Sequence, residues 1–478
     1  MGDSTPISII RSGRVIAVDP FQDVLRSELT FSMVDFSMKR GGKISSQVRK
    51  EEMFYINPDN TTQALIPAGF TYRVCKKLNE AGFNDINYRD IRQLGLEQPD
   101  LSILDDLRDW QKEAVAAMLT SDGGTIWTST ASGKSFLIKK LVMVYPNTPI
   151  IITGHASQPL KAIYDDLCKD IKHEISASGV IGPYFEGRRV NVVHIRSLLK
   201  APVDKAKILV YDESHGAAAG QRSELLSKVA FANMYGFSAS ASGRLDKKEP
   251  VSEGLFGPVI YKMPYTEALA SGLVSKVSVH LYPTDGWERD YDTFYKRMLI
   301  GVVRNDERNR VIAEVARKHD DLKQIVYVMD NLEHVFRLKK LLPDHVPVYG
   351  SGSMTGKRWN QLKRLGLIPE GYSPLQKGEE FRIAEKFRRG EITKAIATSC
   401  WGEGVDFPDL DMLIRADGSP GKIEAIQVPG RVARKVDGKT EGIIVDFTDR
   451  FGRVFENRAK QRLAHYKKLG YEIHECVL

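Results

Sequence analysis

Three short strings of residues could together bind and hydrolyse a nucleoside triphosphate. They are Thr130-Ala-Ser-Gly-Lys-Ser135, Asp212-Glu-Ser-His215 and Gln427-Val-Pro-Gly-Arg-Val-Ala-Arg434. A tight glycine turn followed by lysine can cradle phosphate, paired acids can hold magnesium and activate water, and arginines can neutralise the transition state. Their residue types therefore predict one ATP-hydrolysing site with magnesium as its cofactor.

The first string fits a strand, a tight turn and the start of a helix over residues 126–140. A helix N-terminus favours phosphate, and Lys134 would meet the β and γ oxygens while Ser135 binds magnesium. Thr128 occupies the position where the full phosphate-loop motif has glycine, so a Gly-Lys-Ser turn that occurs by chance is the alternative. The predicted ATP contacts in this string are Thr130, Ala131, Ser132, Gly133, Lys134 and Ser135.

The second string follows the apolar run 208–211, which predicts a buried strand. Such a strand would deliver two acids at its carboxyl end, where the sites of α/β proteins are built. Asp212 would hold magnesium, and Glu213 would orient and deprotonate the attacking water. The alternative is an acidic turn that caps the following helix.

The third string supplies positive charge. Arg431 and Arg434 are three positions apart and would share one face of a helix, from which they could reach phosphate from a facing domain. Gln427 completes the predicted catalytic set of Lys134, Asp212, Glu213, Gln427, Arg431 and Arg434. A solvated basic helix is the alternative for the arginines alone.

Parallel sheets must position these strings, because from about Arg108 short β-branched runs alternate with amphipathic stretches. The predicted strands are 149–153, 190–194, 208–211, 324–329, 394–398, 412–416 and 442–447. The segment 243–276, rich in Gly, Pro and charge, interrupts this pattern and favours two sheets. We therefore predict an α/β protein with motor domains at 98–276 and 277–478, preceded by a small α+β accessory domain at 1–97.

The chain resembles the superfamily 2 helicases of the DExH type over about residues 98–450. Beyond the three strings, the resemblance includes Leu107-Arg-Asp-Trp-Gln111, Ser238-Ala-Ser240 and Thr398-Ser-Cys-Trp-Gly-Glu-Gly-Val-Asp406. It implies two RecA-like domains in tandem that can work as a monomer. It also implies nucleotide contacts from Arg108, Gln111, Gly404 and Asp406, coupling of hydrolysis to strand movement by Ser238 and Ser240, and a nucleic-acid contact from Thr398.

Within that superfamily the chain is similar to XPB and to phage UvsW-type branch-migration helicases. The similar segments are Phe256-Gly-Pro258, Glu267–Leu273 and, in the accessory domain, Leu65–Phe70 followed by Val74–Phe83. This resemblance implies a DNA-binding accessory domain, a double-stranded or branched DNA substrate such as forks and Holliday junctions, and a role in recombination, repair or replication beside proteins of those processes.

Further nucleic-acid contacts are predicted after two strands, at Gly154, His155, Arg196 and Ser197. The segment 353–377 looks like a basic excursion in which Lys357, Arg358 and Trp359 could engage a junction. A solvated surface loop with an aromatic plug is an equal alternative.

Bulk composition agrees with a protein that binds a polyanion. The 478 residues carry 69 Lys and Arg against 61 Asp and Glu, for a net charge of +8. The scattered cysteines and the lack of a long apolar run predict a soluble cytoplasmic protein, in the host cytoplasm if phage-encoded. An RNA helicase, the motor subunit of a restriction system and a non-hydrolysing scaffold remain alternatives.

Overall fold

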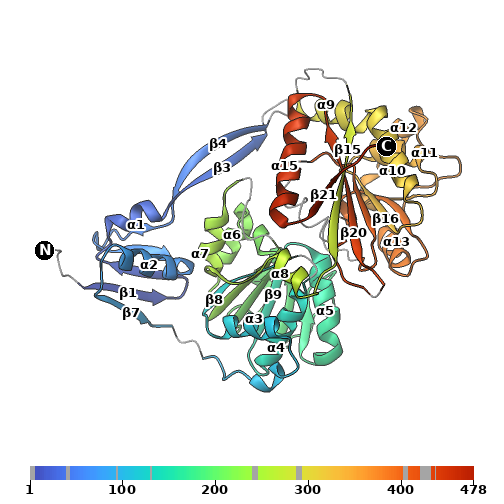
Figure 1. Cartoon of the computed structure of the whole chain (residues 1–478). Coiled ribbons are helices and arrows are strands. Elements are labelled where there is room, and N and C mark those ends of the chain that lie inside the picture. Colours follow the sequence, from blue (N-terminus) through green and yellow to red (C-terminus); the bar gives the residue numbers. More distant parts are fainter. Residues whose placement is uncertain are drawn as a thin grey trace. The chain divides into compact units, whose positions relative to one another are not determined.

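The computed structural model describes residues 6–38, 44–92, 95–129, 132–239, 246–286, 293–401, 407–419, 432–436 and 438–478 (Figure 1). The chain divides into two compact units. Unit 1 comprises residues 1–36, 46–128 and 133–263, and unit 2 comprises residues 37–45, 129–132 and 264–478. In the described part of the chain, no helix is long and apolar enough to cross a membrane.

The accessory domain in unit 1 is a five-stranded mixed sheet of order β5-β6-β2-β1-β7, which packs against α2. A two-stranded ribbon, β3 paired with β4, extends from it (Figure 1). The elements are β1 Ile7–Ser12, β2 Val15–Asp19, α1 Asp23–Glu28, β3 Thr30–Met38, β4 Ile44–Glu52, β5 Tyr55–Ile56, β6 Ala64–Pro67, α2 Thr71–Glu80 and β7 Ile86–Asp90.

The first motor domain, also in unit 1, has a seven-stranded parallel sheet of order β10-β11-β9-β12-β13-β8-β14. Its elements are α3 Asp109–Leu119, β8 Gly123–Thr128, α4 Lys134–Val144, β9 Ile150–Gly154, α5 Ser157–Ile171, β10 Ile175–Ala177, β11 Val190–His194, β12 Ile208–Asp212, α6 Gly220–Ser227, β13 Asn233–Ser238, α7 Glu249–Phe256 and β14 Val259–Met263.

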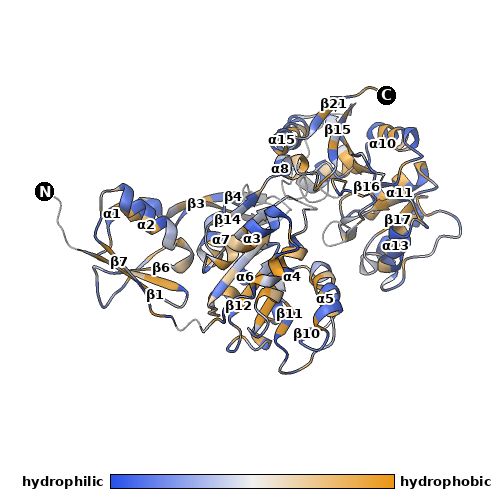
Figure 2. Cartoon of the chain, turned by 60° about the horizontal axis from the view of Figure 1, so that its bottom comes forward, coloured by the Kyte–Doolittle hydropathy of each residue, from blue (hydrophilic) through white to orange (hydrophobic). Residues whose placement is uncertain are grey.

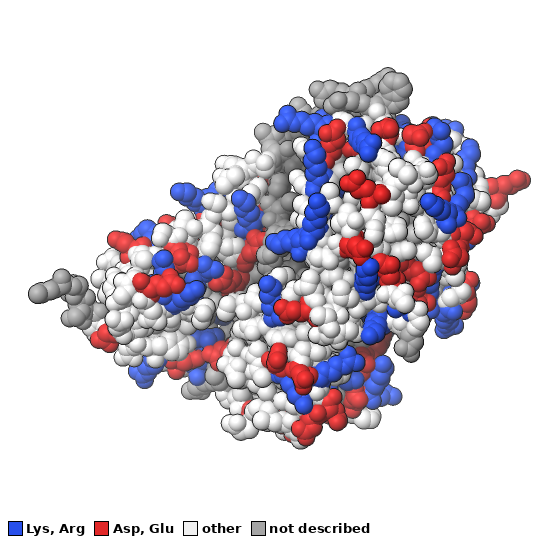
Figure 3. All heavy atoms as spheres, viewed as in Figure 1, with Lys and Arg blue, Asp and Glu red and all other residues white. Residues whose placement is uncertain are grey.

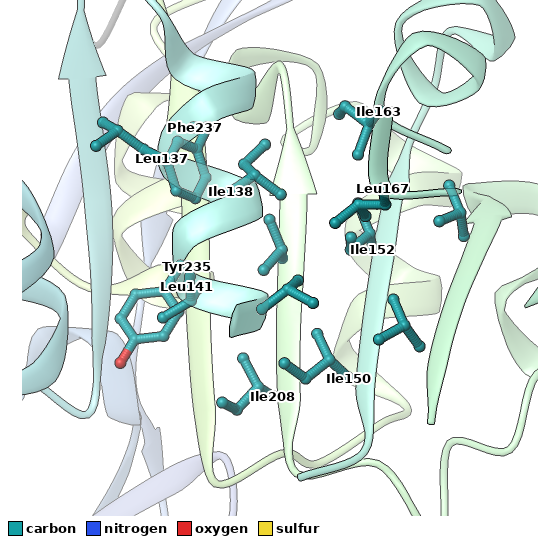
Figure 4. Packing of buried hydrophobic residues seen from close by; sticks show 14 of the residues in the cluster. Leu137, Ile138, Leu141, Ile150, Ile152, Ile163, Leu167, Ile208, Tyr235 and Phe237 are labelled. Atoms are coloured by element: carbon teal, nitrogen blue, oxygen red, sulfur yellow. The ribbon is translucent and has the colours of Figure 1, made fainter. Parts of the chain in front are cut away.

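Helices cover the faces of this sheet, so its inner strands are buried and apolar. Leu137, Ile138 and Leu141 of α4 pack over Ile152 and Phe237 of the sheet (Figure 4). The strands β11 and β12 stand out as hydrophobic in Figure 2. Because α4 is fixed on the sheet along its apolar face, its N-terminus is held at the edge where the strands end.

Unit 2 contains the second motor domain, whose seven-stranded sheet has the order β17-β18-β16-β19-β20-β15-β21 and is again parallel throughout. Its elements are α8 Tyr265–Ala270, β15 Lys276–Thr284, α9 Phe294–Met298, α10 Asp306–Lys318, β16 Gln324–Tyr327, α11 Leu332–Leu341, β17 Val346–Val348, α12 Gly356–Arg364, α13 Glu379–Arg388, β18 Lys394–Ala397, β19 Met412–Arg415, β20 Glu441–Asp449, α15 Arg453–Leu469 and β21 Glu472–Glu475.

The predicted fold class, two parallel α/β sheets in tandem behind a small α+β domain, is confirmed. Each predicted strand exists, with ends shifted by two residues at most. The segment 353–377 is a correction, because it contains helix α12 and is not a continuous loop. Thr355 caps this helix by accepting a hydrogen bond from the Arg358 amide, and Leu362 inserts into the core of unit 2.

Candidate functional site

Two adjacent rows of residues cross the first motor sheet at its carboxyl edge. Parallel register places Trp127 beside Ser238 in one row and Phe237 beside Asp212 in the next. The same row continues from Asp212 to Gly154 of the next strand. Three of the sequence segments singled out for chemistry therefore meet at one edge, as expected for an α/β protein.

The phosphate-loop lysine is the first residue of α4. Gly133 precedes it with φ 97°, a left-handed conformation that suits glycine and turns the chain into the helix. The first amides of a helix lack partners within it and point outward, an arrangement that suits phosphate. Lys134 and Ser135 thus begin the helix that the sequence predicted, and their contacts with phosphate and magnesium stay a prediction.

A chain of polar contacts connects this lysine to the acidic turn after β12. Lys134 Nζ lies 2.8 Å from Oε1 of Glu213, and Nδ1 of His215 lies 3.2 Å from Oε2 of the same carboxylate. Nδ1 of His215 also lies 3.3 Å from Oγ of Ser238. Burial alone would raise the pKa of Glu213, but Lys134 and His215 hold it well below its usual range. Glu213 is therefore an anion between two cationic or hydrogen-bonding partners.

Asp212 lies at the end of β12 and is buried. Burial, together with the neighbouring Glu213 charge, raises its pKa to about 6, although Lys134 opposes both effects. Its carboxylate and the Ser135 hydroxyl are the oxygen ligands that Mg²⁺ prefers. The residues present therefore fit a magnesium ion bound together with the nucleotide.

The segment predicted to contact the nucleotide begins α3. The side-chain oxygen of Gln111 accepts a hydrogen bond from the Arg108 amide at 3.0 Å, which closes the first turn of the helix. The neighbouring Trp110 lies against the phosphate turn, since a Cβ placed on Gly133 would be 3.8 Å from its ring. The segment is thus structurally next to the phosphate loop, although Gln111 is partly occupied by capping.

The predicted nucleic-acid residues of this domain follow β9 and β11. His194 Nε2 donates to the carbonyl oxygen of His155 at 2.9 Å, and its Nδ1 accepts from the Arg196 amide at 3.2 Å. The Arg196 side chain is exposed and Ser197 is half-buried. This geometry leaves the Arg196 guanidinium at the surface, whereas the backbone of His155 belongs to the packing between the two strand ends.

In unit 2, Thr398 is buried and follows β18, with its amide donating to the carbonyl of Val348. The next residue, Ser399, donates both its amide and its hydroxyl to the Asp330 carboxylate, at 3.1 and 2.6 Å. The carbonyl of Arg434 accepts from Ser275 Oγ at 3.0 Å. These contacts fix the backbone of two predicted stations within this unit.

The basic side chains of α12 are exposed at Lys357 and Arg358, whereas Trp359 is half-buried. The Trp359 ring lies 6.4 Å from that of Tyr372, and Lys363 Nζ lies 5.0 Å from the Trp359 centroid. Trp359 thus packs against its own unit. The remaining predicted residues, Thr130, Ala131, Ser240, Gly404, Asp406, Gln427 and Arg431, lie outside the described part of the chain.

Two features escaped the sequence analysis. Asp330 carries no motif signal, because its partner Ser399 is 69 residues away in the chain. Helix α15 exposes Arg453, Lys460, Lys467 and Lys468, and basic side chains line this helix in Figure 3. The heptad spacing of the first three could have indicated a basic face on a helix.

The chain is similar in sequence to known helicases. A family model described as the helicase conserved C-terminal domain matches residues 361–436. The chain is 24% identical to "DNA 3'-5' translocase XPB2" of Sulfurisphaera tokodaii over 73% of this chain and 87% of that protein. It is 22% identical to "ATP-dependent DNA helicase uvsW" of Enterobacteria phage T4, over 72% and 68% respectively.

Among solved structures, the chain is similar to Saccharomyces cerevisiae Dbp5 bound to RNA and ADP BeF3. The TM-score is 0.54 at 16% identity, and the match covers 80% of this chain and 95% of that one. The matched helicase domain and the sequence relatives support a helicase of superfamily 2. It is an ATP-hydrolysing enzyme related to the UvsW helicase, which confirms the family predicted from the sequence.

Proposed function

We propose that this helicase is a DNA translocase that remodels branched DNA, such as forks and Holliday junctions, in recombination, repair or replication. The observation that supports ATP-driven work best is the contact chain from Lys134 through Glu213 and His215 to Ser238. DNA is favoured as the substrate because the XPB2 and uvsW relatives are described as a DNA translocase and a DNA helicase.

Hydrolysis would begin when ATP binds the N-terminus of α4. Lys134 would turn from Glu213 to the β and γ phosphates, which frees the Glu213 carboxylate to orient and deprotonate the attacking water. Mg²⁺ held by Ser135 and Asp212 would neutralise the charge that develops on the phosphoryl group. Arg431 and Arg434 are proposed to add positive charge to the transition state.

His215 would transmit a change at Glu213 to the rest of the first motor domain. Its Nδ1 is within reach of both Glu213 Oε2 and Ser238 Oγ, so a change at the carboxylate alters the hydrogen bond to Ser238. Ser238 ends β13, and the following residues lead to Ser240. This connection gives a physical basis for the proposed coupling of hydrolysis to movement along nucleic acid.

A branched substrate is favoured by the accessory domain. The segments that resemble UvsW-type helicases, Leu65–Phe70 and Val74–Phe83, include most of β6 and most of α2. Helix α2 exposes Tyr72, at 64%, together with Lys76. An aromatic ring beside basic groups is suited to nucleic acid, since bases stack and phosphates attract cations. We propose that residues 1–97 grip DNA while domains 98–276 and 277–478 move it.

RNA is the second candidate substrate, because the fold is also that of Dbp5, whose structure holds RNA. The ATPase residues do not distinguish the sugar. An exposed guanidinium such as Arg196 would serve either polymer, since phosphate contacts carry no sequence or sugar information.

The test measures steady-state ATP hydrolysis by the full chain with no nucleic acid, single-stranded DNA, linear duplex, a four-way junction or structured RNA. Junction unwinding is then followed for the best activator. We expect the junction to stimulate most and to be unwound. Strongest stimulation by RNA would overturn the DNA assignment, and stimulation by linear duplex alone would overturn the branched one.

A matched pair of variants tests the mechanism. Glu213→Gln should retain ATP binding but lower turnover by about a hundredfold or more, because the amide cannot accept the water proton. Glu224→Gln is the control, since Glu224 is exposed on α6 and pairs only with Lys228 among the described residues. Undiminished turnover in Glu213→Gln would contradict the role given to this acid.

A further inference from the structure

The accessory domain is joined to the first motor domain at several places within unit 1, including a contact from Arg14 to the Leu255 carbonyl of α7, and two of these places hold Arg73 and Arg92. At one place, Arg73 of α2 forms a bidentate pair with Glu253 of α7, with distances of 2.8 and 2.7 Å. Its remaining nitrogen bonds Glu28 at 2.6 Å. At the other place, Arg92 donates to the Ala232 carbonyl at 2.7 Å and pairs with Asp122 at 3.1 Å.

Backbone contact makes the Arg73 attachment close. Gly69, which precedes α2, lies directly against α7. A Cβ at Gly69 would collide with the carbonyl oxygen of Glu253 and lie 2.7 Å from that of Gly254. Gly254 in turn packs on Phe70, with a built Cβ only 3.0 Å from its ring. Helix α7 is therefore seated between the accessory domain and the motor sheet.

The other side of α7 packs on the strand and the turn that carry the catalytic acids. The Phe256 ring lies 5.7 Å from that of Tyr211, the residue before Asp212. A Cβ at Gly236 would lie 2.8 Å from Ser214, the residue after Glu213, and 3.1 Å from Phe256. Phe256 thus packs on Tyr211 before the acid pair, and Gly236 lies between Phe256 and Ser214, the residue after the pair.

The turn that follows β12 depends on the packing around it, because Glu213 has φ 53°. A non-glycine residue in the left-handed region is strained and persists where the surrounding packing holds it. A pocket of about 380 Å³ lies between α2 and the residues Ser214 and His215, so α2 reaches the acid turn through α7 and not by direct packing there.

We propose that Arg73 is a positioning residue for ATP hydrolysis, and that the accessory domain uses it to hold α7 against the turn carrying Glu213. The proposal rests on the role of Glu213 in the proposed function, and it adds a catalytic task to a domain so far assigned to DNA. Loss of the Arg73–Glu253 pair would let α7 shift and would misplace the carboxylate, while the phosphate loop keeps its nucleotide contacts.

Three variants of the full chain test this role: Arg73→Gln, Glu253→Gln and the double variant. We expect each to lower kcat for ATP by about three- to tenfold with or without nucleic acid, while KM for ATP and the half-activating nucleic-acid concentration stay within about twofold. The double variant should match the single ones, because both changes break one contact. Arg73→Lys should recover part of the loss, since one of the two hydrogen bonds can form.

Arg92→Gln is the matched control. It removes an equally charged link between the same two domains, but Ala232 and Asp122 precede the amino ends of β13 and β8, at the edge opposite the acids. This variant should lower the melting temperature and leave kcat within about twofold.

Three results would overturn the proposal: an unchanged kcat in folded Arg73→Gln, a loss confined to the half-activating nucleic-acid concentration, or an equal kcat loss in Arg92→Gln. If no nucleic acid stimulates hydrolysis by the wild type, the proposed substrate is refuted. The comparison of kcat between the Arg73 and Arg92 variants would still be valid.

Discussion

The indole N–H of Trp127 donates a hydrogen bond to the carbonyl oxygen of Ala239, at 2.9 Å. Trp127 lies on β8 just before the phosphate loop, and Ala239 follows Ser238 at the end of β13. Lys262 of β14 lies 4.6 Å from the Trp127 ring centroid and covers it. The end of β13 is therefore held at Ser238 by His215, and the next residue, Ala239, is held by Trp127.

Replacement of this indole should uncouple hydrolysis from movement. Trp127→Phe keeps an aromatic ring under Lys262 but removes the donor to Ala239, so Ala239 loses this hydrogen bond. We expect ATP turnover to stay within about threefold, because Lys134 and Glu213 are untouched, and DNA unwound per ATP to fall about fivefold. That loss corresponds to about 1 kcal/mol, an ordinary value for one hydrogen bond. Parallel assays of phosphate release and strand separation measure both quantities.

Trp401→Phe serves as the control for this prediction. Trp401 is buried against Phe387 and Phe407, and its indole nitrogen has no hydrogen-bond partner in the described part of the chain. Phenylalanine at this position removes packing contacts but breaks no hydrogen bond of the described residues. Equal DNA unwound per ATP in Trp127→Phe and wild type would refute a coupling role for the indole.

Sequence alone could locate the ATPase edge because parallel strands end together. The buried run before Asp212 predicted a strand with the acids at its carboxyl end, so a local pattern sufficed there. Ser238 was singled out by the family resemblance instead, and its strand β13 was not predicted. The hydrogen bond from Trp127 to Ala239 could not be predicted, because the two residues are 112 positions apart. An aromatic residue in a strand is also ordinarily part of the core. Helix α12 escaped because its surface is charged and one deeply buried residue, Leu362, anchors it.

The close approach of the accessory domain to α7 gives a prediction about stability. Gly69→Ala places a methyl group against the backbone oxygens of Glu253 and Gly254, which cannot move away as a flexible side chain could. We expect a loss of at least about 2 kcal/mol, or release of the accessory domain, because overpacking forces backbone shifts. Thermal unfolding and limited proteolysis between the two domains would detect either result.

Gly220→Ala is the corresponding control, because a Cβ there meets no atom within 4 Å. Gly220 opens α6, where alanine is favoured over glycine. This variant should be as stable as the wild type or slightly more so. A Gly69→Ala protein with wild-type unfolding and proteolysis would mean that the accessory domain does not press on α7.

The second unit carries a buried histidine that should make its stability depend on pH. His334 of α11 is fully buried, and its Nε2 lies 3.1 Å from Oδ1 of Asn309. Burial, together with the nearby charges of Arg308 and Arg337, lowers the pKa of His334 to about 3. His345 follows the same trend, since burial is the main cause that lowers its pKa to about 4. Both imidazoles are therefore neutral in the folded unit.

The sign of the pH dependence follows from these directions. The pKa of an unfolded histidine is about 6.5, so below that pH the unfolded chain binds protons that the folded unit does not bind. Stability is thus fully present above about pH 6.5 and falls as the pH drops, with a limiting slope of about 1.4 kcal/mol per pH unit for each histidine. His334→Gln retains an amide donor for Asn309 and cannot titrate, so it should flatten the slope by about one proton.

Hydrogen exchange of the α11 amides between pH 7 and 5 measures the stability of this unit alone. His173→Gln, which removes an exposed imidazole of the other unit, should keep the wild-type slope; the same slope in His334→Gln would show that His334 does not carry the effect.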